Sequence, residues 1–388
     1  MIYFTAGESH GPELTGIIEG FPAGLKLSID RINDKLSRRQ QGYGRGYRQK
    51  IEKDRIIVTS GVRHGVTLGS PITLRIVNID HNHWREIMKP IGEPEPGIAM
   101  REVKNPRPGH ADLVGGMKYG HRDLRNVLER SSARETAMRV AIGAVCIQLL
   151  EALGIRIIGY VRRVGPIEAD AQRLSSVEEI ERAVEQNDLR IVRQDKVRSI
   201  HELIDRTHKA GDTLGGVVRV LAQNVPAGLG SYTSWNEKLD ARIAAAVVGI
   251  NAMKGVSFGD GFALSRDRGS EAMDQIYWDR ENGWTRGSNH LGGFEGGMTN
   301  GMPIIVNAAM KPIPTLYKPL HSVSIDSKQE HKAGIERSDT TAIVPASLII
   351  EAIVAIELCR AILDTFDSNS LTRLKQQYRD YRDELKNY

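Results

Sequence analysis

Residues 7–11 read Gly-Glu-Ser-His-Gly and place a serine and a histidine side by side between two glycines. The pentapeptide matches G-x-S-x-G, the nucleophile elbow of serine hydrolases, in which Ser9 would attack the substrate. An elbow of that kind joins a strand to a helix and needs a distant acid and histidine. Here a short strand is expected over 2–5 and a second β-leaning run over 14–20. We therefore predict strand, tight turn and strand, and His10 becomes the better candidate for chemistry.

A second histidine, His110, stands in another glycine-bounded turn, the segment Asn-Pro-Arg-Pro-Gly-His-Ala-Asp over 105–112. A single histidine in such a turn is usually structural. Two of them, each near arginines such as Arg107, favour general acid chemistry, because imidazole titrates near neutral pH.

The segment over 38–50 combines alternating glycines with arginines, among them Arg39, Arg45 and Arg48. Exposed backbone N–H groups and guanidinium groups can together bind phosphate or carboxylate. Taken alone, the segment is best explained as a solvated basic loop, with small-anion binding as the second interpretation. An RGG-like RNA-binding segment, in which tyrosines stack on bases, is a third.

Residues 130–137 are predicted to open a buried helix. The first turn of a helix presents free N–H groups and partial positive charge, so it attracts anions. Arg130 and Arg134 in that turn would oppose the helix dipole unless an anion is bound there. The alternative is plain capping by Ser131 or Ser132.

Glycines are also dense before Pro314. Lys311 and Thr315 are candidates to hold a phosphate beside a flat ligand that Gly296 and Gly297 allow to approach closely. No G-x-G-x-x-G follows a clear strand, so a Rossmann dinucleotide site is not expected. His81 with His83, and the histidines over 201–208, lack a convincing set of further ligands, so no metal site is predicted.

The elements that must position these residues follow from hydrophobic periodicity and end signals. Helices are expected over 28–41, with Ser28 as N-cap, from Ser132 to 153 with capping-box spacing to Glu135, and over 238–251 and 345–363. Strands are expected over 2–5, 14–20, 56–61, 72–77, 155–161 and 255–259. The helices are apolar almost all round, which indicates burial on most faces. The sequence therefore predicts an α+β fold with a buried layer of helices between antiparallel sheets.

The length of 388 residues, without a linker, is interpreted as a single domain over 1–388, whose charged C-terminal tail 371–388 is the most loosely attached part. A net charge of +5 is small for this length, so the whole chain is not expected to bind nucleic acid. No signal peptide or membrane span is recognised, and Cys146 and Cys359 are expected to be buried thiols. These features favour a cytoplasmic protein.

Taken together, the segments resemble the chorismate synthase family along essentially the whole chain. The resemblance rests on six motifs in order, with matching spacing: Gly7 to Pro22, Gly42 to Arg48, Arg107 to Asp112, Glu129 to Thr136, Gly292 to Gly297 and Arg337 to Thr340. It implies a homotetrameric β-α-β sandwich enzyme, a carbon–oxygen lyase that eliminates phosphate from 5-enolpyruvylshikimate 3-phosphate to give chorismate. This is the last common step of the shikimate pathway of aromatic amino acid biosynthesis, and it needs reduced FMN without net redox change.

The resemblance also implies roles for individual residues. His10 looks like the acid beside the departing phosphate, His110 like the residue that protonates or stabilises the reduced flavin, and Asp339 like the carboxylate that assists proton removal from substrate. The residues that match the family's substrate-binding positions are Ser9, Arg39, Arg45, Arg48, Arg107, Ser132, Arg134 and Arg337. Those that match its FMN-binding positions are Arg130, Ser131, Ser132, Asn251, Ala252, Gly296, Lys311, Pro312, Ile313, Pro314, Thr315 and Arg337.

The sequence leaves open how the flavin is kept reduced. NADPH bound through the region of Arg39 and Arg45 is one route, and a separate flavin reductase is the other. A serine hydrolase using Ser9 and an RNA-binding module built on 42–48 remain as competing hypotheses.

Overall fold

The computed structural model describes residues 1–388 except 47–51, 99, 171–175, 337 and 368. Two predicted site residues, Arg48 and Arg337, lie outside the described residues.

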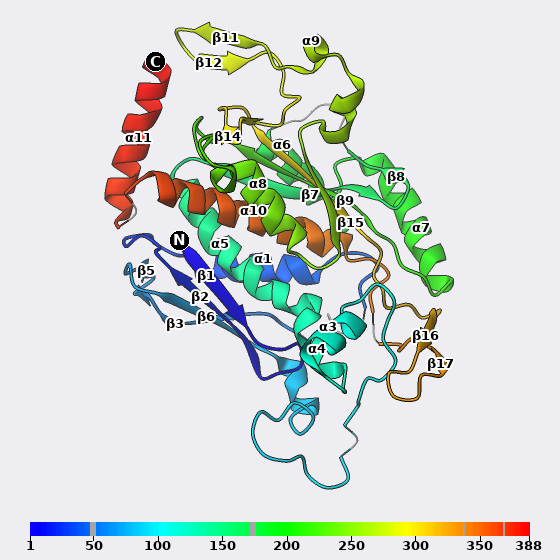
Figure 1. Cartoon of the computed structure of the whole chain (residues 1–388). Helices are drawn as coiled ribbons and strands as arrows, with labels where there is room; N and C mark the ends of the chain where they lie inside the picture. The colour runs from blue at the N-terminus through cyan, green and yellow to red at the C-terminus, as the bar shows by residue number, and fades with distance from the viewer. Residues whose placement is uncertain (47–51, 99, 171–175, 337, 368) are drawn as a thin grey trace.

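The N-terminal residues form a four-stranded antiparallel sheet (Figure 1). Its strands, in spatial order, are β1 (Ile2–Ala6), β2 (Glu13–Glu19), β6 (Ile72–Val77) and β3 (Ile56–Ser60). Strands β1 and β2 pair as a hairpin around residues 7–12, so the predicted strand, turn and strand is confirmed and no nucleophile elbow is formed. Gly7 has a φ of 105°, and a Cβ there would lie 2.3 Å from the carbonyl oxygen of Glu13, so only glycine fits this turn.

A second antiparallel sheet has five strands. In spatial order they are β10 (Met253–Phe258), β15 (Ile304–Met310), β9 (Gly216–Gln223), β7 (Arg156–Val164) and β8 (Ile167–Glu168). Four of the six predicted strands are in the first sheet and two in the second, so every predicted strand exists, with ends shifted by a few residues.

Four helices build the centre of the molecule. They are α1 (Ile29–Gln40), α5 (Thr136–Ala152), α8 (Leu239–Val248) and α10 (Ile343–Thr365). Helix α5 contacts β2 and β6 of the first sheet, α10 contacts β7 and β9 of the second, and the two helices pack on each other (Figure 1). The two helices approach closely at Gly143, where a Cβ would lie only 2.3 Å from that of Ala352, so only glycine fits there. The prediction of a mixed α and β chain is confirmed, as is the cap of α1 by Ser28. Helices α5 and α10 are buried on most faces as predicted, but α1 buries only Ile32, Leu36 and Arg39, so the prediction that it is apolar almost all round is wrong.

The predicted N-cap of the buried helix at Ser132 is confirmed, but the helix begins with a 3-10 turn and lacks the predicted capping box. Ser132 has an extended backbone, with φ −68° and ψ 144°, and separates α4 (Arg125–Ser131) from the 3-10 turn η2 (Ala133–Glu135), after which α5 begins. The capping box is absent, since the Ser132 hydroxyl accepts from the N–H of Arg134 and Glu135 binds Arg139 instead. Arg130 consequently lies in the last turn of α4, where a cation is favoured by the helix dipole and needs no bound anion.

The other elements are shorter or peripheral. The helices are α3 (Asp112–Tyr119), α6 (Val177–Val184), α7 (Val197–Lys209), α9 (Gly269–Ala272), α11 (Leu371–Asn387) and the 3-10 turns η1 (Ile79–His83), η3 (Gln194–Lys196), η4 (Trp235–Glu237) and η5 (Gly261–Arg266). The two-stranded pairs are β4 (Val62–Arg63) with β5 (Val66–Thr67), β11 (Ile276–Asp279) with β12 (Gly283–Arg286), β13 (Phe294–Glu295) with β14 (Met298–Thr299), and β16 (His321–Val323) with β17 (Glu330–Lys332). Helix α11 occupies the predicted tail and buries Leu374 and Tyr378.

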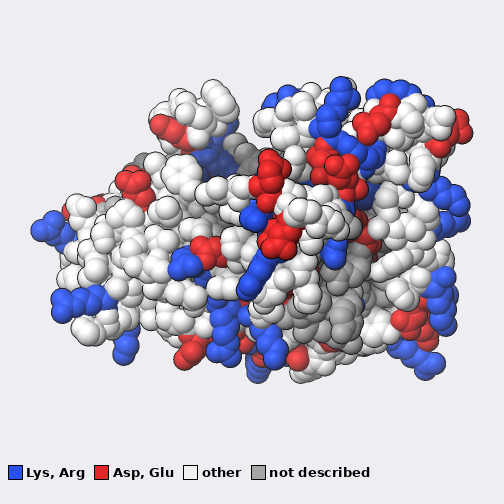
Figure 2. Space-filling view, turned by 90° about the horizontal axis from the view of Figure 1, so that it is seen from below, with Lys and Arg blue, Asp and Glu red and all other residues white. Residues whose placement is uncertain are grey.

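Charges of both signs are distributed over the face seen in Figure 2. Lys and Arg alternate there with Asp and Glu and do not gather into one continuous basic surface. Within the described residues, no helix combines the length and apolar character that crossing a membrane requires. Cys146 and Cys359 are both buried free thiols, as predicted.

Candidate active site

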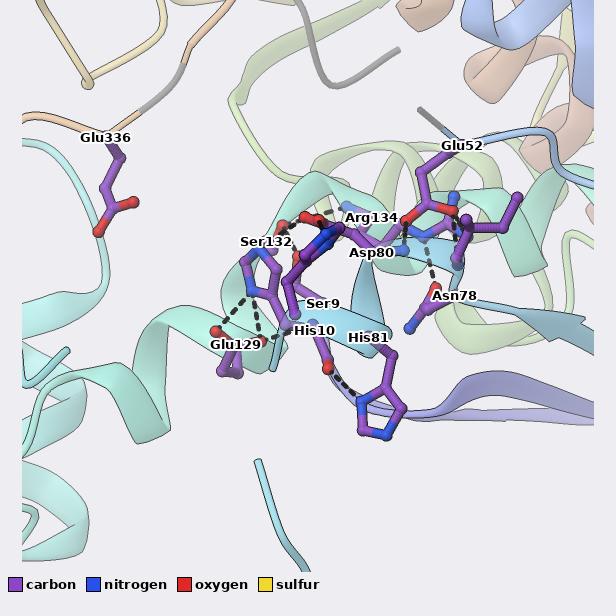
Figure 3. Close-up of polar contacts among 12 residues, drawn as sticks. Ser9, His10, Glu52, Asn78, Asp80, His81, Glu129, Ser132, Arg134 and Glu336 are labelled. Atoms are coloured by element: carbon purple, nitrogen blue, oxygen red, sulfur yellow. Dashed lines mark hydrogen bonds and ion pairs between the residues drawn. The ribbon is translucent and has the colours of Figure 1, made fainter. Parts of the chain in front are cut away.

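The turn between β1 and β2 places His10 against α4, and the ring is paired there with Glu129 (Figure 3). The Nδ1 atom lies 2.8 Å from Oε1 and 3.0 Å from Oε2 of the carboxylate. The backbone N–H of His10 also donates to Oε2 at 2.7 Å, and that of Ser9 donates to the Glu129 carbonyl at 2.9 Å. The histidine is therefore anchored through both its backbone and its ring.

The His10 ring is also stacked. Its centroid lies 4.0 Å from that of Trp84, with an interplanar angle of 26°. The guanidinium of Arg101 lies over the Trp84 ring at 4.3 Å and that of Arg125 at 5.1 Å. Beyond the ring, Nε2 lies 3.9 Å from a carboxylate oxygen of Asp80. These contacts leave the imidazole buried and confined to one plane.

Ser9 of the β1–β2 turn contacts Ser132, which directly follows α4. The Ser9 hydroxyl donates to the Ser132 hydroxyl at 3.1 Å. Both residues were predicted to line the substrate pocket, and the structure brings them together beside His10 (Figure 3).

Two predicted anion-binding arginines, Arg39 and Arg134, converge on the carboxylate of Asp54. Arg134 Nη1 donates to Oδ1 at 2.6 Å, and Arg39 Nη1 lies 3.7 Å from Oδ2. Arg134 also donates to Asn78 at 2.8 Å, and its Nη2, 3.8 Å from Glu52, is buried without a hydrogen-bond partner among the described residues. An unsatisfied guanidinium N–H at this position suits an incoming anion.

Arg107 and His110 form a second buried cluster with Asp112. Arg107 donates from Nε to Oδ2 at 2.8 Å and from Nη2 to Oδ1 at 3.0 Å, and His110 Nδ1 lies 2.6 Å from Oδ1. Arg107 Nη1 donates to the Thr315 hydroxyl at 2.9 Å, which joins the predicted substrate and flavin residues. Burial opposes ionisation of Asp112, but hydrogen bonds from His110 and Arg107 outweigh it and hold the pKa of this carboxyl well below its usual range.

The depressed pKa of Asp112 predicts a particular acid sensitivity. Its carboxylate contributes stability that is complete above the unfolded pKa of about 3.9 and is lost as pH falls toward the lower folded value. We expect Asp112→Asn to be less stable than wild type at pH 6 and the difference to shrink below pH ~4. Urea unfolding of both proteins across this range measures it, and two parallel stability curves would contradict it.

The third predicted catalytic residue, Asp339, is paired with a predicted substrate ligand. Arg45 Nη1 lies 2.7 Å from its Oδ2, and the N–H of Gly46 donates to Oδ1 at 2.5 Å. The backbone N–H of Thr340 donates to the carbonyl of Gly44 at 2.9 Å. The glycine-rich loop is therefore fixed against the segment that carries Asp339.

Most of the predicted flavin residues contact one another or follow one another along the chain, and we call this group the flavin strip. It consists of Ser131, Asn251, Ala252 and residues 311–314. Asn251 Nδ2 donates to the Ser131 carbonyl at 2.5 Å, and the N–H of Lys311 donates to the carbonyl of Ala252 at 2.9 Å. Ala252 has a φ of 71°, an uncommon backbone conformation for a residue with a side chain. The segment from Pro312 to Pro314 continues the strip, since the Ile313 carbonyl accepts from Thr213 and a Cβ at Gly109 would lie 3.7 Å from Pro314.

Two predicted flavin residues, Arg130 and Gly296, lie outside the flavin strip and make other contacts. Arg130 donates to the carbonyls of Thr5 and Gly7, at 2.7 and 2.9 Å, and so fixes the start of the His10 turn. Gly296 lies in the turn between β13 and β14, where a Cβ would meet only Tyr232 and Met298. Among the described contacts, none joins Gly296 to the other predicted flavin residues.

A cavity of about 410 Å³ opens on the side of Trp84. Its lining includes Arg101, Lys104, Arg107 and Arg125, with Glu336 as a counter-charge. The volume is within the range of small-ligand sites. A larger groove, of about 940 Å³, lies between α11 and the hairpins after β10, away from His10.

The histidines that resemble metal ligands have other partners. His81 Nδ1 lies 2.9 Å from the carbonyl oxygen of His10, and His201 lies 2.8 Å from Asp188. In the described part of the chain no group of three or more His, Cys, Asp or Glu side chains is arranged to hold a metal ion.

Sequence reasoning missed the carboxylates and the indole that hold the functional side chains. They are Glu52, Asp54, Asp80, Trp84, Asp112 and Glu129. Asp112 and Glu129 lie inside the recognised motifs, so their sequence positions could have identified them as partners of the histidines. Trp84 and Asp54 stand in segments with no chemical pattern.

A buried histidine paired with a carboxylate, beside clustered arginines, is the site of an enzyme that acts on an anionic small molecule. The comparisons with known proteins agree. Residues 1–363 match the sequence profile of the chorismate synthase family. The chorismate synthase of Lactiplantibacillus plantarum is 63% identical over 386 residues, covering 100% of this chain and 99% of the relative, and that of Limosilactobacillus fermentum is 60% identical over 388 residues, covering 100% of both. A crystal structure of a chorismate synthase matches with a TM-score of 0.81 at 40% identity, covering 100% of this chain and 98% of the other.

The chain therefore belongs to the chorismate synthase family. It is accordingly a carbon–oxygen lyase of the shikimate pathway, which serves aromatic amino acid biosynthesis. The family resemblance inferred from six sequence motifs is confirmed.

Proposed function

We propose that this chain converts 5-enolpyruvylshikimate 3-phosphate to chorismate by anti-1,4-elimination of phosphate, with His10 as the acid. The observation that carries the proposal is the buried His10–Glu129 pair, set among arginines suited to a substrate with one phosphate and two carboxylates. In this mechanism Nε2 of His10 gives a proton to the departing phosphate. The hydroxyls of Ser9 and Ser132 orient the substrate at the same place.

The arginines supply binding and orientation. Arg39, Arg107 and Arg134 are all nearly buried, so their charges act at low effective dielectric. Each is held by a carboxylate, which fixes the direction of its remaining N–H groups before the substrate arrives. We propose that these groups, with Arg45, Arg48 and Arg337, bind the three anionic groups of the substrate.

The residues of the flavin strip fit reduced FMN. The ammonium group of Lys311 tests this fit. Within the described residues it forms no ion pair, and its one hydrogen bond is a 3.5 Å contact to the Pro312 carbonyl, so it is free to bind a phosphate. Burial, followed by repulsion from Lys254, lowers the pKa of Lys311, and a bound phosphate would remove that penalty. Reduced FMN, when bound, would supply the electron density that helps phosphate to leave.

Further residues would hold the flavin and handle protons near it. We assign Arg130 to Ser132, Asn251, Ala252, Gly296 and Lys311 to Thr315 to FMN binding. His110, oriented through Nδ1 by Asp112, would present Nε2 to the flavin. The Asp339 carboxylate would assist removal of the ring proton from the substrate.

Several broader features of the family are proposed for this chain on the same basis. The two sheets and the helices between them would correspond to the family's β-α-β sandwich, formed by a single domain over 1–388. The assembly would be a homotetramer in the cytoplasm. Reduced flavin would come either from NADPH bound near Arg39 and Arg45 or from a separate flavin reductase.

The proposal is tested by assaying purified protein with 5-enolpyruvylshikimate 3-phosphate and photoreduced FMN. Chorismate and inorganic phosphate should appear in equal amounts, and oxidised FMN should support neither. If reduced FMN released no phosphate from this substrate, the proposed function would be wrong. Adding NADPH and oxidised FMN to the pure protein distinguishes intrinsic from external flavin reduction.

Lys311→Ala is expected to weaken FMN binding selectively. Loss of one charge-assisted hydrogen bond to the phosphate costs ~1.5–3 kcal/mol, which corresponds to a Kd about 10- to 100-fold higher. Riboflavin, which lacks the phosphate, serves as the matched ligand and should bind wild type and variant alike. Flavin fluorescence titration measures both, and equal weakening for the two ligands would place Lys311 away from the phosphate.

A further inference from the structure

The His10 ring is held from several sides by groups on different elements. Glu129 of α4 contacts Nδ1 and Asp80 of η1 lies 3.9 Å from Nε2 (Figure 3). Trp84 stacks on the ring plane. The side chain of Glu129 is 1% exposed and that of His10 is 8% exposed. A carboxylate as deeply buried as this one must be compensated by its partners.

We propose that Glu129 is a positioning residue that sets the tautomer of His10 for the proposed elimination. Its carboxylate keeps the proton of the ring on Nδ1 and leaves Nε2 as the atom that exchanges a proton with the substrate. This inference rests on the proposed function, since it assigns Glu129 its role through His10.

The hydrogen-bonding chemistry requires this tautomer. An ionised carboxylate only accepts hydrogen bonds, so Nδ1, within 3.0 Å of both its oxygens, must carry a hydrogen. Burial would favour the neutral acid, but hydrogen bonds from the ring and backbone of His10 outweigh it and lower the pKa of Glu129. Arg125 adds a positive charge 3.4 Å from Oε1. Glu129 therefore remains ionised at neutral pH.

The other charged groups around the ring show why Glu129 is needed. Asp80 faces Nε2, so without Glu129 the nearest carboxylate would attract the ring proton to the wrong nitrogen. The His81 ring lies against the backbone carbonyl of His10 and not its imidazole, and Arg101 lies on Trp84. In the reaction the N–H bond at Nε2 of the imidazolium breaks as an O–H bond forms on the departing phosphate, and the neutral ring then regains a proton from water. Glu129 holds the hydrogen on Nδ1 in both forms of the ring and so keeps Nε2 directed toward the substrate.

Glu129→Gln tests the assignment. Its amide oxygen can accept the backbone N–H of His10, but its NH₂ group then donates to Nδ1 and favours a proton on Nε2 in the neutral ring. We expect long-range ¹⁵N–¹H spectra of histidine-labelled protein, with the His10 signal identified by its loss in His10→Ala, to show Nδ1–H in wild type and Nε2–H in the variant. We also expect kcat to fall about 10- to 100-fold, the usual scale for loss of an orienting partner, with a smaller change in KM.

Glu202→Gln is the matched control, because Glu202 pairs with Arg198 at 3.0 Å on the exposed surface of α7 and has no contact with His10 among the described residues. It should keep the wild-type tautomer and kcat. Glu129→Asp, which keeps the charge but shortens the reach, should give a mixture of tautomers and an intermediate kcat. It replaces Glu129→Gln if that variant fails to fold.

The wild-type tautomer and an unchanged kcat in Glu129→Gln, or in Glu129→Asp where only that variant folds, would overturn the inference. The spectra need neither substrate nor flavin. If wild type made no chorismate, the proposed function would therefore fail while the tautomer measurement still decided the role of Glu129.

Discussion

Replacing His10 with alanine is expected to lower kcat by about 10²–10⁴-fold, the usual contribution of general acid–base catalysis. The variant removes the only side chain of the β1–β2 turn whose ring is paired with a buried carboxylate, stacked on Trp84 and directed toward Asp80. Water can protonate a departing phosphate, but without the orientation that these contacts provide. Initial rates at saturating substrate with reduced FMN measure the loss.

The matched control for His10→Ala is His83→Ala on η1. His83 also lies within 4 Å of Asp80, at 3.3 Å, but its side chain is 73% exposed, so near-wild-type turnover is expected. Thermal unfolding of both variants separates loss of activity from loss of fold. A wild-type rate in His10→Ala would remove this histidine from the mechanism.

Local sequence patterns predicted the elements that carry the site because each pattern reflects one buried face. The β-leaning runs over 14–20 and 72–77 and the apolar runs predicted to end at 153 and to span 345–363 each became a strand or helix in nearly the predicted place. Ser132 caps the helical turn after it, as its local signal predicted, but its other contact was not predictable in this way. Its side chain also meets Ser9, 123 residues away, and the helix α4 that ends just before it was not predicted. Such a contact is set by the tertiary fold and leaves no periodic signal.

For the arginines, the sequence predicted the ligand class but not the carboxylates that hold them. The sequence predicted anion binding by Arg39, Arg107 and Arg134, and the structure places each of them against a carboxylate. Asp54 is 80 positions from Arg134, and in the sequence it stands in the ordinary charged run Glu52-Lys-Asp-Arg55. An aspartate on the surface and an aspartate buried as a counter-ion can occur in the same local sequence, so only the fold distinguishes the two cases. Asp112, five residues from Arg107, lies within one turn and was the easier of the two to find.

Asp54→Asn is expected to lower the free energy of unfolding by about 3–5 kcal/mol, because it leaves buried guanidinium charge without its counter-ion. The Asp54 side chain is 0% exposed, and those of Arg39 and Arg134 are 7% and 6% exposed. Burial already lowers the pKa of Arg39 to about 10, with Asp54 acting in the opposite direction, so Arg39 remains charged at neutral pH. Asparagine keeps the shape and removes only the charge, and urea unfolding measures the difference.

An exposed pair on the same helix as Arg39 provides the control. Arg38 Nε lies 2.8 Å from Asp34, but the Asp34 side chain is 55% exposed, so Asp34→Asn should cost at most about 1 kcal/mol. The two variants lose the same charge and differ in burial. A small anion that binds between Arg39 and Arg134 should restore part of the stability of Asp54→Asn, because it replaces the missing charge. Equal costs for the two variants would mean that water reaches the arginines around Asp54, and that their preorganisation for substrate does not depend on this carboxylate.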